Sequence, residues 1–394
     1  MRPLDIEVTC PVFDSFRVQQ IAGMFDAPLA QRASQRFHID LPDGIVEDDA
    51  DSAHDAARRD SQPPRAWKLG LVVGPSGSGK STMARAMFGD RVCRPSAWPD
   101  DRAVIDGFGP RPVKEVTRLL TAVGFSSPPS WVKPYHVLST GEQFRCDLAR
   151  ALATDRGETE SENDELLDAG AAAEKPPLVV FDEFTSVVDR NVARVVSAAV
   201  AQGIRAGRIA RRLVAVTCHY DVTEWLAPDW VIDMATSTFS WRCLQRPPIQ
   251  LEIFRCRRRA WRLFACHHYL SGALAQYARC FMATWQGEPV AFCASVSLIG
   301  RKNRWRISRI VTRPDYQGVG IGMSVVEAVA ELHVQEGHRV NVTASHPALL
   351  AHCRRSPRWR LVNVRKTGSR NTRNFIHNYR GSTGRAVASF EFLR

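Results

Sequence analysis

The sequence lacks any apolar run of the roughly 18–20 residues that crossing a bilayer requires. Its first residues contain no apolar signal-peptide core, and its ten cysteines form no Cys-x-x-Cys pair. This distribution argues against a disulfide framework and against a zinc module. We therefore expect a cytoplasmic protein that does not enter the membrane. Apolar residues make up 44% of the 394, which is sufficient for ordinary cores in two or three domains.

Acidic residues are scarce in the last third of the chain. From position 245 onward there are 25 Lys and Arg against 7 Asp and Glu, within a net charge of +12 for the whole chain. Three arginine-rich clusters lie there, at 255–264, 301–306 and 354–360, and aromatic residues lie among the arginines. Such a field attracts polyanions, and arginines beside aromatics suit phosphates and stacked bases. Nucleic acid is therefore a candidate partner, and a solvated charged surface is the alternative.

A glycine-rich stretch, Gly74 to Ser81, follows the apolar run 69–73 and precedes the helix-compatible run 82–88. We call it the phosphate loop, because it fills every fixed position of the phosphate-binding pattern between a strand and a helix. Its backbone N–H groups can face a triphosphate, Lys80 can reach the β- and γ-phosphates, and the Ser81 hydroxyl can hold Mg²⁺. The residues expected to bind the nucleotide are Gly74, Ser76, Gly77, Gly79, Lys80, Ser81 and Thr82.

Two carboxylates end a second apolar strand, at 178–181. Asp182 is placed to hold Mg²⁺ through water, and Glu183 to orient or deprotonate the attacking water. A third strand, 213–217, leads to His219. Together with the phosphate loop, this order predicts a nucleotide-hydrolysing site with Ser81 and Asp182 as the Mg²⁺ ligands.

The stretch Leu138 to Gln143 opens a helix and resembles the signature motif of the ABC ATPases. In that family the motif contacts the γ-phosphate of ATP bound by the opposite subunit. The resemblance therefore implies an ATP-dependent homodimer, with Ser139 and Gly141 at the nucleotide. It also implies a D-loop that places Asp189 there, and a switch histidine at His219. The implied catalytic residues are Glu183, His219 and Lys80.

No glutamine lies between Lys80 and Ser139, although ABC ATPases normally have one there after a strand. We expect that strand at 102–106, with Asp106 at its end, and a helix at 113–123. Thr140 departs from the usual glycine of the signature motif, and Glu142 stands where transporters mostly have Gln. The altered coupling region argues against a transporter ATPase subunit, which stays as an alternative.

Segments around these motifs complete the ATPase part. Expected strands at 4–12 and 36–42, with a helix at 16–25, resemble the family's N-terminal sheet, which supplies an aromatic to stack on adenine. Phe13 and Phe16 are candidates for that role, or are ordinary core or surface aromatics. Acidic segments without periodicity predict mobile insertions at 44–65 and 155–177. A Pro-rich linker at 244–248 then separates an ATP-binding domain, 1–246, from a second domain, 249–394.

The second domain reads as a hairpin at 279–296, a strand at 305–311, a turn, a helix at 323–335, a strand at 339–344 and a helix at 347–353 that precedes the stretch 359–362. This order resembles the GNAT acyltransferases. Gln317, Gly320 and Gly322 match the turn whose backbone N–H groups bind the pyrophosphate of acetyl-CoA in that family, and we call residues 317–322 the GNAT turn. The implied acetyl-CoA-binding residues are Ile310, Val311, Gln317, Gly318, Val319, Gly320 and Gly322.

Acyl transfer needs a base for the accepting amine and an acid for the departing thiolate. The GNAT family has no universal residue in these roles. The candidates are His267, His268 and Tyr269 on the acceptor side, and Ser345 and His346 after the expected strand 339–344. Each of them is alternatively structural, and Cys266 with the two histidines is alternatively a metal corner that lacks a second ligand pair.

These patterns predict an α/β protein in which a P-loop ABC ATPase domain is followed by a GNAT-like acyltransferase domain. The expected cofactors are ATP, Mg²⁺ and acetyl-CoA. The expected function is ATP hydrolysis joined to N-acyl transfer, with nucleic acid or a nucleic-acid-associated molecule as a candidate acceptor. Two alternatives stay open: a transporter ATPase subunit, and a nucleic-acid-binding ATPase with an inactive GNAT-like domain.

Overall fold

The structure is a computed structural model of the chain. It describes all residues except 1, 10, 12, 25–33, 43, 46–64, 94–96, 154–175, 242–247, 269–272, 299, 301, 367–385 and 394. The predicted insertions and linker lie largely outside the described residues, as does Tyr269. The chain forms two compact units: residues 1–95, 157–187 and 210–245 make the first, and residues 96–156, 188–209 and 246–394 make the second. The predicted domain boundaries at 246 and 249 stay a prediction.

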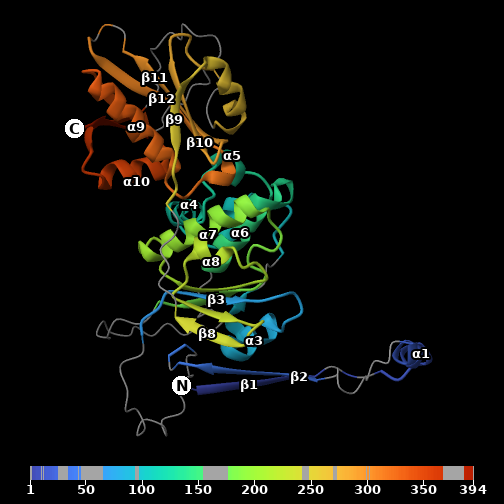
Figure 1. Cartoon of the computed structure of the whole chain (residues 1–394). Coiled ribbons are helices and arrows are strands. Elements are labelled where there is room, and N and C mark those ends of the chain that lie inside the picture. Colours follow the sequence, from blue (N-terminus) through green and yellow to red (C-terminus); the bar gives the residue numbers. More distant parts are fainter. Residues whose placement is uncertain are drawn as a thin grey trace. The chain divides into compact units, whose positions relative to one another are not determined.

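The first unit is organised around a six-stranded sheet with the order β4-β5-β6-β3-β7-β8 (Figure 1). All neighbours are parallel except β7 and β8. Its strands are β3 Leu69–Val73, β4 Val92–Cys93, β5 Leu178–Phe181, β6 Arg212–Thr217, β7 Trp230–Asp233 and β8 Thr238–Trp241. Its helices are α3 Lys80–Phe88, η2 Gly89–Arg91 and α8 Val222–Leu226.

Burial explains this sheet. Every residue of β3 and of β6 is buried, as expected for parallel strands covered on both faces. Gly70 is required where the indole of Trp230 crosses β3, because a Cβ atom there would lie 2.1 Å from the ring. A separate hairpin of β1 Arg2–Thr9 and β2 Ser34–Leu41 is antiparallel, and α1 Phe16–Met24 lies between its strands in sequence. Phe13 and Phe16 are both exposed.

The second unit contains helices from the predicted ATPase part. They are η3 Val104–Phe108, α4 Val113–Ala122, α5 Pro128–Trp131, η4 Tyr135–Val137, α6 Thr140–Ala153 and α7 Arg190–Arg205. We call α4 to α7, with the loops joining α4 to α6, the helical segment. Helix α6 contacts α4, and α4 contacts α7, which buries the apolar faces of all three.

The predicted strand at 102–106 is wrong. Residues 104–108 form the 3-10 helix η3, in which Asp106 N donates to Ala103 O at 3.0 Å. This conformation buries Val104 and Phe108 together. It also brings Gly107 against Trp98, where a Cβ atom would lie 2.3 Å from the indole. Asp106 therefore does not stand at a strand end, and nothing here supports it as a replacement for the missing glutamine.

The acyltransferase part of the second unit has a seven-stranded sheet with the order β14-β15-β13-β12-β11-β10-β9. Only β12 and β13 pair in parallel. The strands are β9 Glu252–Cys256, β10 Arg279–Trp285, β11 Glu288–Ser297, β12 Arg304–Thr312, β13 Arg339–Ala344, β14 Trp359–Lys366 and β15 Ala386–Phe392. The helices are η5 Arg258–Leu263, η6 Ala265–His267, η7 Pro314–Tyr316, α9 Ile321–Gln335 and α10 Pro347–Arg355.

Helix α9 packs on β11, β12 and β13, and it buries Val325, Val326 and Val329 (Figure 1). The predicted hairpin, strands and helices of this part are confirmed, and the whole structure confirms the α/β class. Strands β9 and β15 were not predicted. Within the described residues, no helix is both long enough and apolar enough to cross a membrane.

Candidate functional site

The phosphate loop leaves β3 and ends at the first residues of α3. Gly77 and Gly79 have φ of +78° and +80°, a left-handed conformation that favours glycine. Gly79 directly precedes α3, and no side chain caps the helix. The first N–H groups of α3 therefore lack an intrahelical acceptor and point toward the loop. Lys80 Nζ donates to Pro75 O at 2.7 Å, so its ammonium group lies over the same loop.

The predicted Mg²⁺ ligands meet in the structure. Ser81 Oγ donates to Asp182 Oδ1 at 3.0 Å, which joins the start of α3 to the end of β5. Asp182 is buried. A hydroxyl and a carboxylate at this separation are oxygen donors of the kind that Mg²⁺ takes in nucleotide sites. Ser78 Oγ is buried beside the loop without a hydrogen-bond partner in the described part of the chain.

Glu183 follows Asp182 with an exposed side chain and a φ of +56°. Its N–H donates to Asp182 Oδ1 at 3.0 Å. Left-handed backbone at a residue other than glycine costs roughly 1–3 kcal/mol and concentrates at functional positions. His219 follows β6 and is half-buried, and its N–H donates to Thr217 Oγ1 at 3.2 Å. Both residues therefore follow neighbouring parallel strands at the carboxyl edge of the sheet.

The predicted signature residues lie in the second unit, at the start of α6. Ser139 N and Ser139 Oγ each donate to Glu142 Oε2 at 3.1 Å, and Glu142 N donates to Ser139 Oγ at 3.4 Å. This is a capping box, which explains Glu142 without reference to a nucleotide. Asp189 likewise caps α7, accepting from Asn191 N and Val192 N. A Cβ atom on Gly141 would contact Val192, so the starts of α6 and α7 lie together.

The GNAT turn begins after η7 and ends at α9. Gly318 and Gly320 have φ of +89° and +92°. Gly320 precedes α9 without a side-chain cap, as Gly79 precedes α3. A Cβ atom on Gly320 would meet no atom within 4 Å, so this side of the turn is open. A Cβ atom on Gly322 would lie 2.9 Å from Thr312 Oγ1, so α9 starts close against β12.

Strands β12 and β13 separate next to this turn. Their parallel pairing runs from Arg304 to Ile307 on β12 and stops there, although β12 continues to Thr312. Ile310 and Val311 pair with β11 on the other side. Within the described residues, the side of 308–312 away from β11 has no strand partner. The predicted acetyl-CoA residues of β12 therefore lie where backbone groups stay available to a ligand.

The side-chain amide of Gln317 is engaged in two hydrogen bonds within the protein. Its Oε1 accepts from Ser126 N at 2.9 Å, and its Nε2 donates to Thr312 O at 3.0 Å. The prediction for Gln317 concerns the backbone N–H groups of the turn, and it stays a prediction. The sequence carries no signal for the contact with Ser126, because the two residues are 191 positions apart.

The acid–base candidates have different surroundings. Burial lowers the pKa of His268 to about 4, with a smaller effect of Arg309, so the ring is neutral near pH 7. Burial also lowers the pKa of the exposed His267, with a smaller effect of Arg313. His346 uses both ring nitrogens, because Nδ1 accepts from Ala348 N at 3.3 Å and Nε2 donates to Ser126 O at 3.2 Å. His346 is therefore better explained by structure than by proton transfer.

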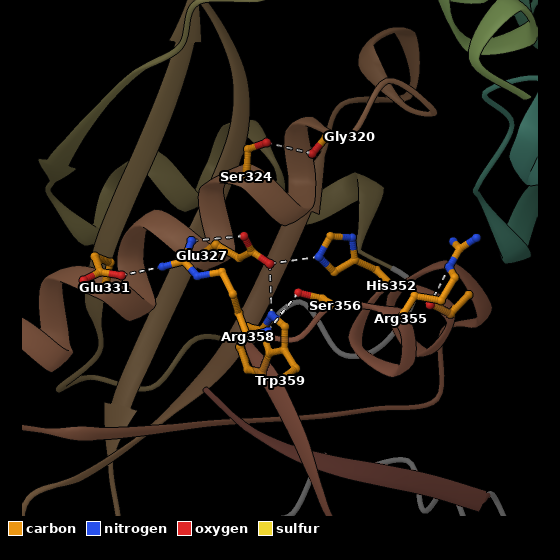
Figure 2. Close-up of polar contacts among 10 residues, drawn as sticks. Gly320, Ser324, Glu327, Glu331, His352, Arg355, Ser356, Arg358 and Trp359 are labelled. Atoms are coloured by element: carbon orange, nitrogen blue, oxygen red, sulfur yellow. Dashed lines mark hydrogen bonds and ion pairs between the residues drawn. The ribbon is translucent and has the colours of Figure 1, made fainter. Parts of the chain in front are cut away.

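A polar network fixes α9, the helix that the GNAT turn starts (Figure 2). Glu327 accepts from His352 Nε2 at 2.9 Å and from Trp359 Nε1 at 3.1 Å. Arg358 pairs with Glu327 and with Glu331. Helix α9 is thereby tied to α10 and β14, which limits the movement of the turn.

The same pairs change the interpretation of the basic clusters. In the third cluster, Arg358 is neutralised by α9, and Arg360 pairs with Glu391 at 2.7 Å. In the first cluster, Trp261 is only 7% exposed and Phe264 is buried, so the expected base-stacking role of these aromatics is wrong. They pack against Phe292 in the core instead. The five arginines of the first cluster are exposed, so its electrostatic role stays available.

Two further features lie at the C-terminal half of α9. A cavity of about 240 Å³ is lined by β9, β10 and α9 and contains none of the predicted site residues. Beside it, possible ligand atoms of His333, Glu336 and His338 lie within 4.8 Å of one another. Arg279 already pairs with Glu336, so the carboxylate of this group is engaged by a side-chain cation.

Comparison with known proteins identifies the second part of the chain. The model of the acetyltransferase (GNAT) family matches residues 237–352. The chain therefore contains a GNAT acetyltransferase domain, and the resemblance seen in the sequence is confirmed there. No curated protein matches the chain.

Solved structures resemble parts of the chain. An IAA acetyltransferase from Bacillus cereus is 16% identical over 36% of this chain and 99% of its own, with a TM-score of 0.29. A ribosomal-protein-S18-alanine N-acetyltransferase from Escherichia coli is 14% identical over 36% and 93%, with a TM-score of 0.28. A bacterial ABC transporter cassette, solved as a dimer, is 16% identical over 47% and 90%, with a TM-score of 0.31. These scores support no conclusion about activity, so the ABC resemblance depends on its motifs.

Proposed function

We propose that the chain is an ATP-hydrolysing ABC-type ATPase fused to an acetyl-CoA-dependent N-acyltransferase. One observation carries the proposal. In both parts a left-handed glycine, Gly79 or Gly320, ends a turn and starts a helix that has no side-chain cap. Each helix offers unpaired N–H groups at its positive end, which is a favourable place for phosphate oxygens.

In the ATPase part, the side chains around the phosphate loop fit a nucleotide with Mg²⁺. Lys80 needs only to exchange Pro75 O for a phosphate oxygen, and Ser81 with Asp182 supplies oxygen donors for the metal. The metal's role would be to neutralise charge on the phosphates. Glu183, with its exposed carboxylate, is assigned to the attacking water, whose oxygen displaces ADP from the γ-phosphorus.

In the acyltransferase part, the GNAT turn is assigned to the pyrophosphate of acetyl-CoA. The acceptor nitrogen attacks the thioester carbonyl carbon and the C–S bond breaks. The amine loses one proton, and the sulfur of CoA gains one. His267 and His268 stay candidates for the base, because burial lowers their pKa values and keeps both rings neutral near pH 7.

A homodimer is part of the proposal. Ser139 is exposed and Gly141 is partly exposed at the start of α6, and we assign them to ATP held by the phosphate loop of a second copy. ATP should then join two chains, and hydrolysis at Glu183 should release them.

A polyanionic acceptor or an acceptor bound to one is supported by the exposed first cluster. Arg257 and Arg259 are exposed, and no ion pair within the described part of the chain neutralises either side chain. This support is electrostatic and does not select between DNA, RNA and an acidic protein.

Crossed calorimetry tests the proposal. Lys80→Ala should weaken ATP binding about 10–100-fold, because a charge-assisted contact to phosphate is lost. Gly320→Glu should abolish acetyl-CoA binding, because a carboxylate would replace the open side of the turn. Each variant should leave the other ligand's affinity unchanged.

The matched controls are Lys68→Ala, an exposed lysine before β3, and Gly287→Glu, a left-handed hairpin glycine with no atom within 4 Å of its Cβ position. An intact protein that binds neither ligand would overturn the proposal. Mass spectrometry of candidate acceptors after incubation with labelled acetyl-CoA, with and without ATP, separates a transferase from a domain that only binds.

A further inference from the structure

The loop after α4 lies directly against the GNAT turn, and both belong to the second compact unit. A Cβ atom on Gly318 would lie 2.6 Å from Gly124 Cα, and one on Gly124 would lie 3.0 Å from Gln317 O. Both glycines have a φ of +89°. The two backbones therefore approach more closely than any other pair of residue types would allow.

Ser126 uses both of its backbone polar groups in this contact. Its N–H donates to Gln317 Oε1 at 2.9 Å, and its carbonyl accepts from His346 Nε2 at 3.2 Å. Gln317 continues to Thr312 O through its Nε2 at 3.0 Å. One residue of the helical segment thus links the GNAT turn, the end of β12 and the start of α10.

Arg145 of α6 adds a charged contact to the residue just before the turn. Its side chain is 1% exposed, and its Nη2 lies 3.8 Å from Asp315 Oδ1. Nε and Nη2 have no hydrogen-bond partner in the described part of the chain. A buried guanidinium leaves a large uncompensated cost when its ion pair is removed, so this pair favours a position of Asp315 next to Arg145.

We infer that the helical segment is a working part of the acetyl-CoA site: Gly124, Ser126 and Arg145 are positioning residues that hold the GNAT turn in its binding conformation. The inference rests on the proposed function, since it needs the turn to bind acetyl-CoA. A turn fixed in advance loses less freedom when ligand arrives, and so binds more tightly. Arg145 also lies near Gly141, whose Cβ position is 3.4 Å from Nη1. ATP at the signature residues could therefore alter the turn through one side chain.

A pair of glycine variants tests the inference. Gly124→Ala should weaken acetyl-CoA binding about tenfold, because the new methyl group must displace Gln317 O. Gly207→Ala is the matched control: it lies after α7 in the same unit, has a φ of +67°, and would contact no atom within 4 Å. It introduces the same kind of backbone strain and should leave acetyl-CoA affinity unchanged. Calorimetry with acetyl-CoA and thermal unfolding measure the two effects separately.

A charge variant gives a second, milder test. Asp315→Asn keeps the shape of the side chain, and it should weaken acetyl-CoA binding several-fold at a temperature where thermal unfolding shows the variant folded, while Asp315→Glu retains the affinity. The control is Asp101→Asn, the same substitution at an exposed aspartate 3.9 Å from Arg102, which lies outside both the helical segment and the GNAT turn and should leave the affinity unchanged.

The outcomes separate the inference from the proposed function. If the unmodified protein binds no acetyl-CoA, the proposed function fails and the inference fails with it. If it binds, but Gly124→Ala and Asp315→Asn bind equally well, only the inference is overturned. Equal weakening by Gly124→Ala and Gly207→Ala would also overturn it, since strain alone would then explain the loss.

Discussion

The phosphate loop and the GNAT turn share a backbone geometry but differ in what supports them. Both end in a left-handed glycine that starts an uncapped helix. The phosphate loop is supported by an aromatic side chain, because a Cβ atom on Gly79 would lie 2.5 Å from Phe37 Cζ. The GNAT turn is supported by a second backbone, that of Gly124 and Ser126.

This difference separates two ways of building an anion site. At the phosphate loop the proposal assigns phosphate and metal binding to the charged side chains Lys80 and Asp182, which belong to the same unit as the loop. At the GNAT turn the proposal assigns binding to backbone N–H groups alone, so we expect their position to decide the affinity. We therefore expect ligand binding to be affected most by substitutions of charged side chains at the phosphate loop, and most by substitutions that change backbone packing at the GNAT turn.

The largest effect should come from Glu183→Gln. Removing a group that orients or deprotonates water should slow ATP hydrolysis about 100-fold or more, while ATP binding stays intact. The ATP-bound variant should then sediment as a dimer. Asp189→Asn, at the cap of α7, should weaken this dimer without changing ATP binding to one chain. A Glu183→Gln protein that remains a strict monomer at saturating ATP would remove the dimer from the proposal.

The support of the first turn can be measured with alanine. Gly79→Ala and Gly77→Ala each pay about 1–2 kcal/mol for a left-handed backbone. Gly79→Ala should lower the free energy of unfolding by roughly 1–3 kcal/mol more, because its methyl group contacts Phe37. In thermal unfolding, Gly79→Ala should therefore have a lower melting temperature than Gly77→Ala. At the second turn, Gly320→Ala should resemble Gly77→Ala, since its Cβ position is open; equal melting of all three would contradict the described packing.

Acid should lower the free energy of unfolding of the acyltransferase part. Burial, with a smaller effect of Arg279, lowers the pKa of His333 to about 4 from 6.5. The unfolded chain therefore binds more protons between these values, and the stabilisation present above pH 6.5 is lost as pH falls toward 4. Unfolding between pH 7.5 and pH 5 should show a loss on the order of 1–2 kcal/mol. His333→Gln should show a smaller pH dependence, and Leu332→Gln, which changes an exposed residue of the same helix and no titratable group, should show an unchanged one.

The smallest effect should come from the surface. Arg257→Glu should weaken binding to duplex DNA or RNA about threefold to tenfold at low salt, and the effect should shrink as salt rises. The equivalent change at Arg17, exposed on α1, should have little effect if the first cluster makes the contact. If binding does not depend on salt, or if nothing binds, the hypothesis of a polyanionic acceptor is excluded.

Local pattern was sufficient for both turns and for most elements. The apolar run before Gly74 and the run before Thr312 predicted strands, and the glycines after them predicted helix starts. The prediction of a strand at 102–106 was wrong, because a 3-10 turn buries Val104 and Phe108 together next to Trp98. No alternation of apolar residues in the sequence indicates such a turn. The base-stacking role of Trp261 failed for a similar reason, since its burial depends on Phe292 in another strand.

The sequence by itself determined the two glycine turns, their helices and the paired carboxylates, because each depends on neighbours within a few residues along the chain. Only the tertiary structure decided that Gln317 is held by Ser126, that Arg145 is buried beside Asp315, and that His346 uses both ring nitrogens. Such contacts join residues far apart in the chain, and they depend on which side chains the packed elements bring together. Composition and motif spacing do not indicate which of these distant residues come into contact.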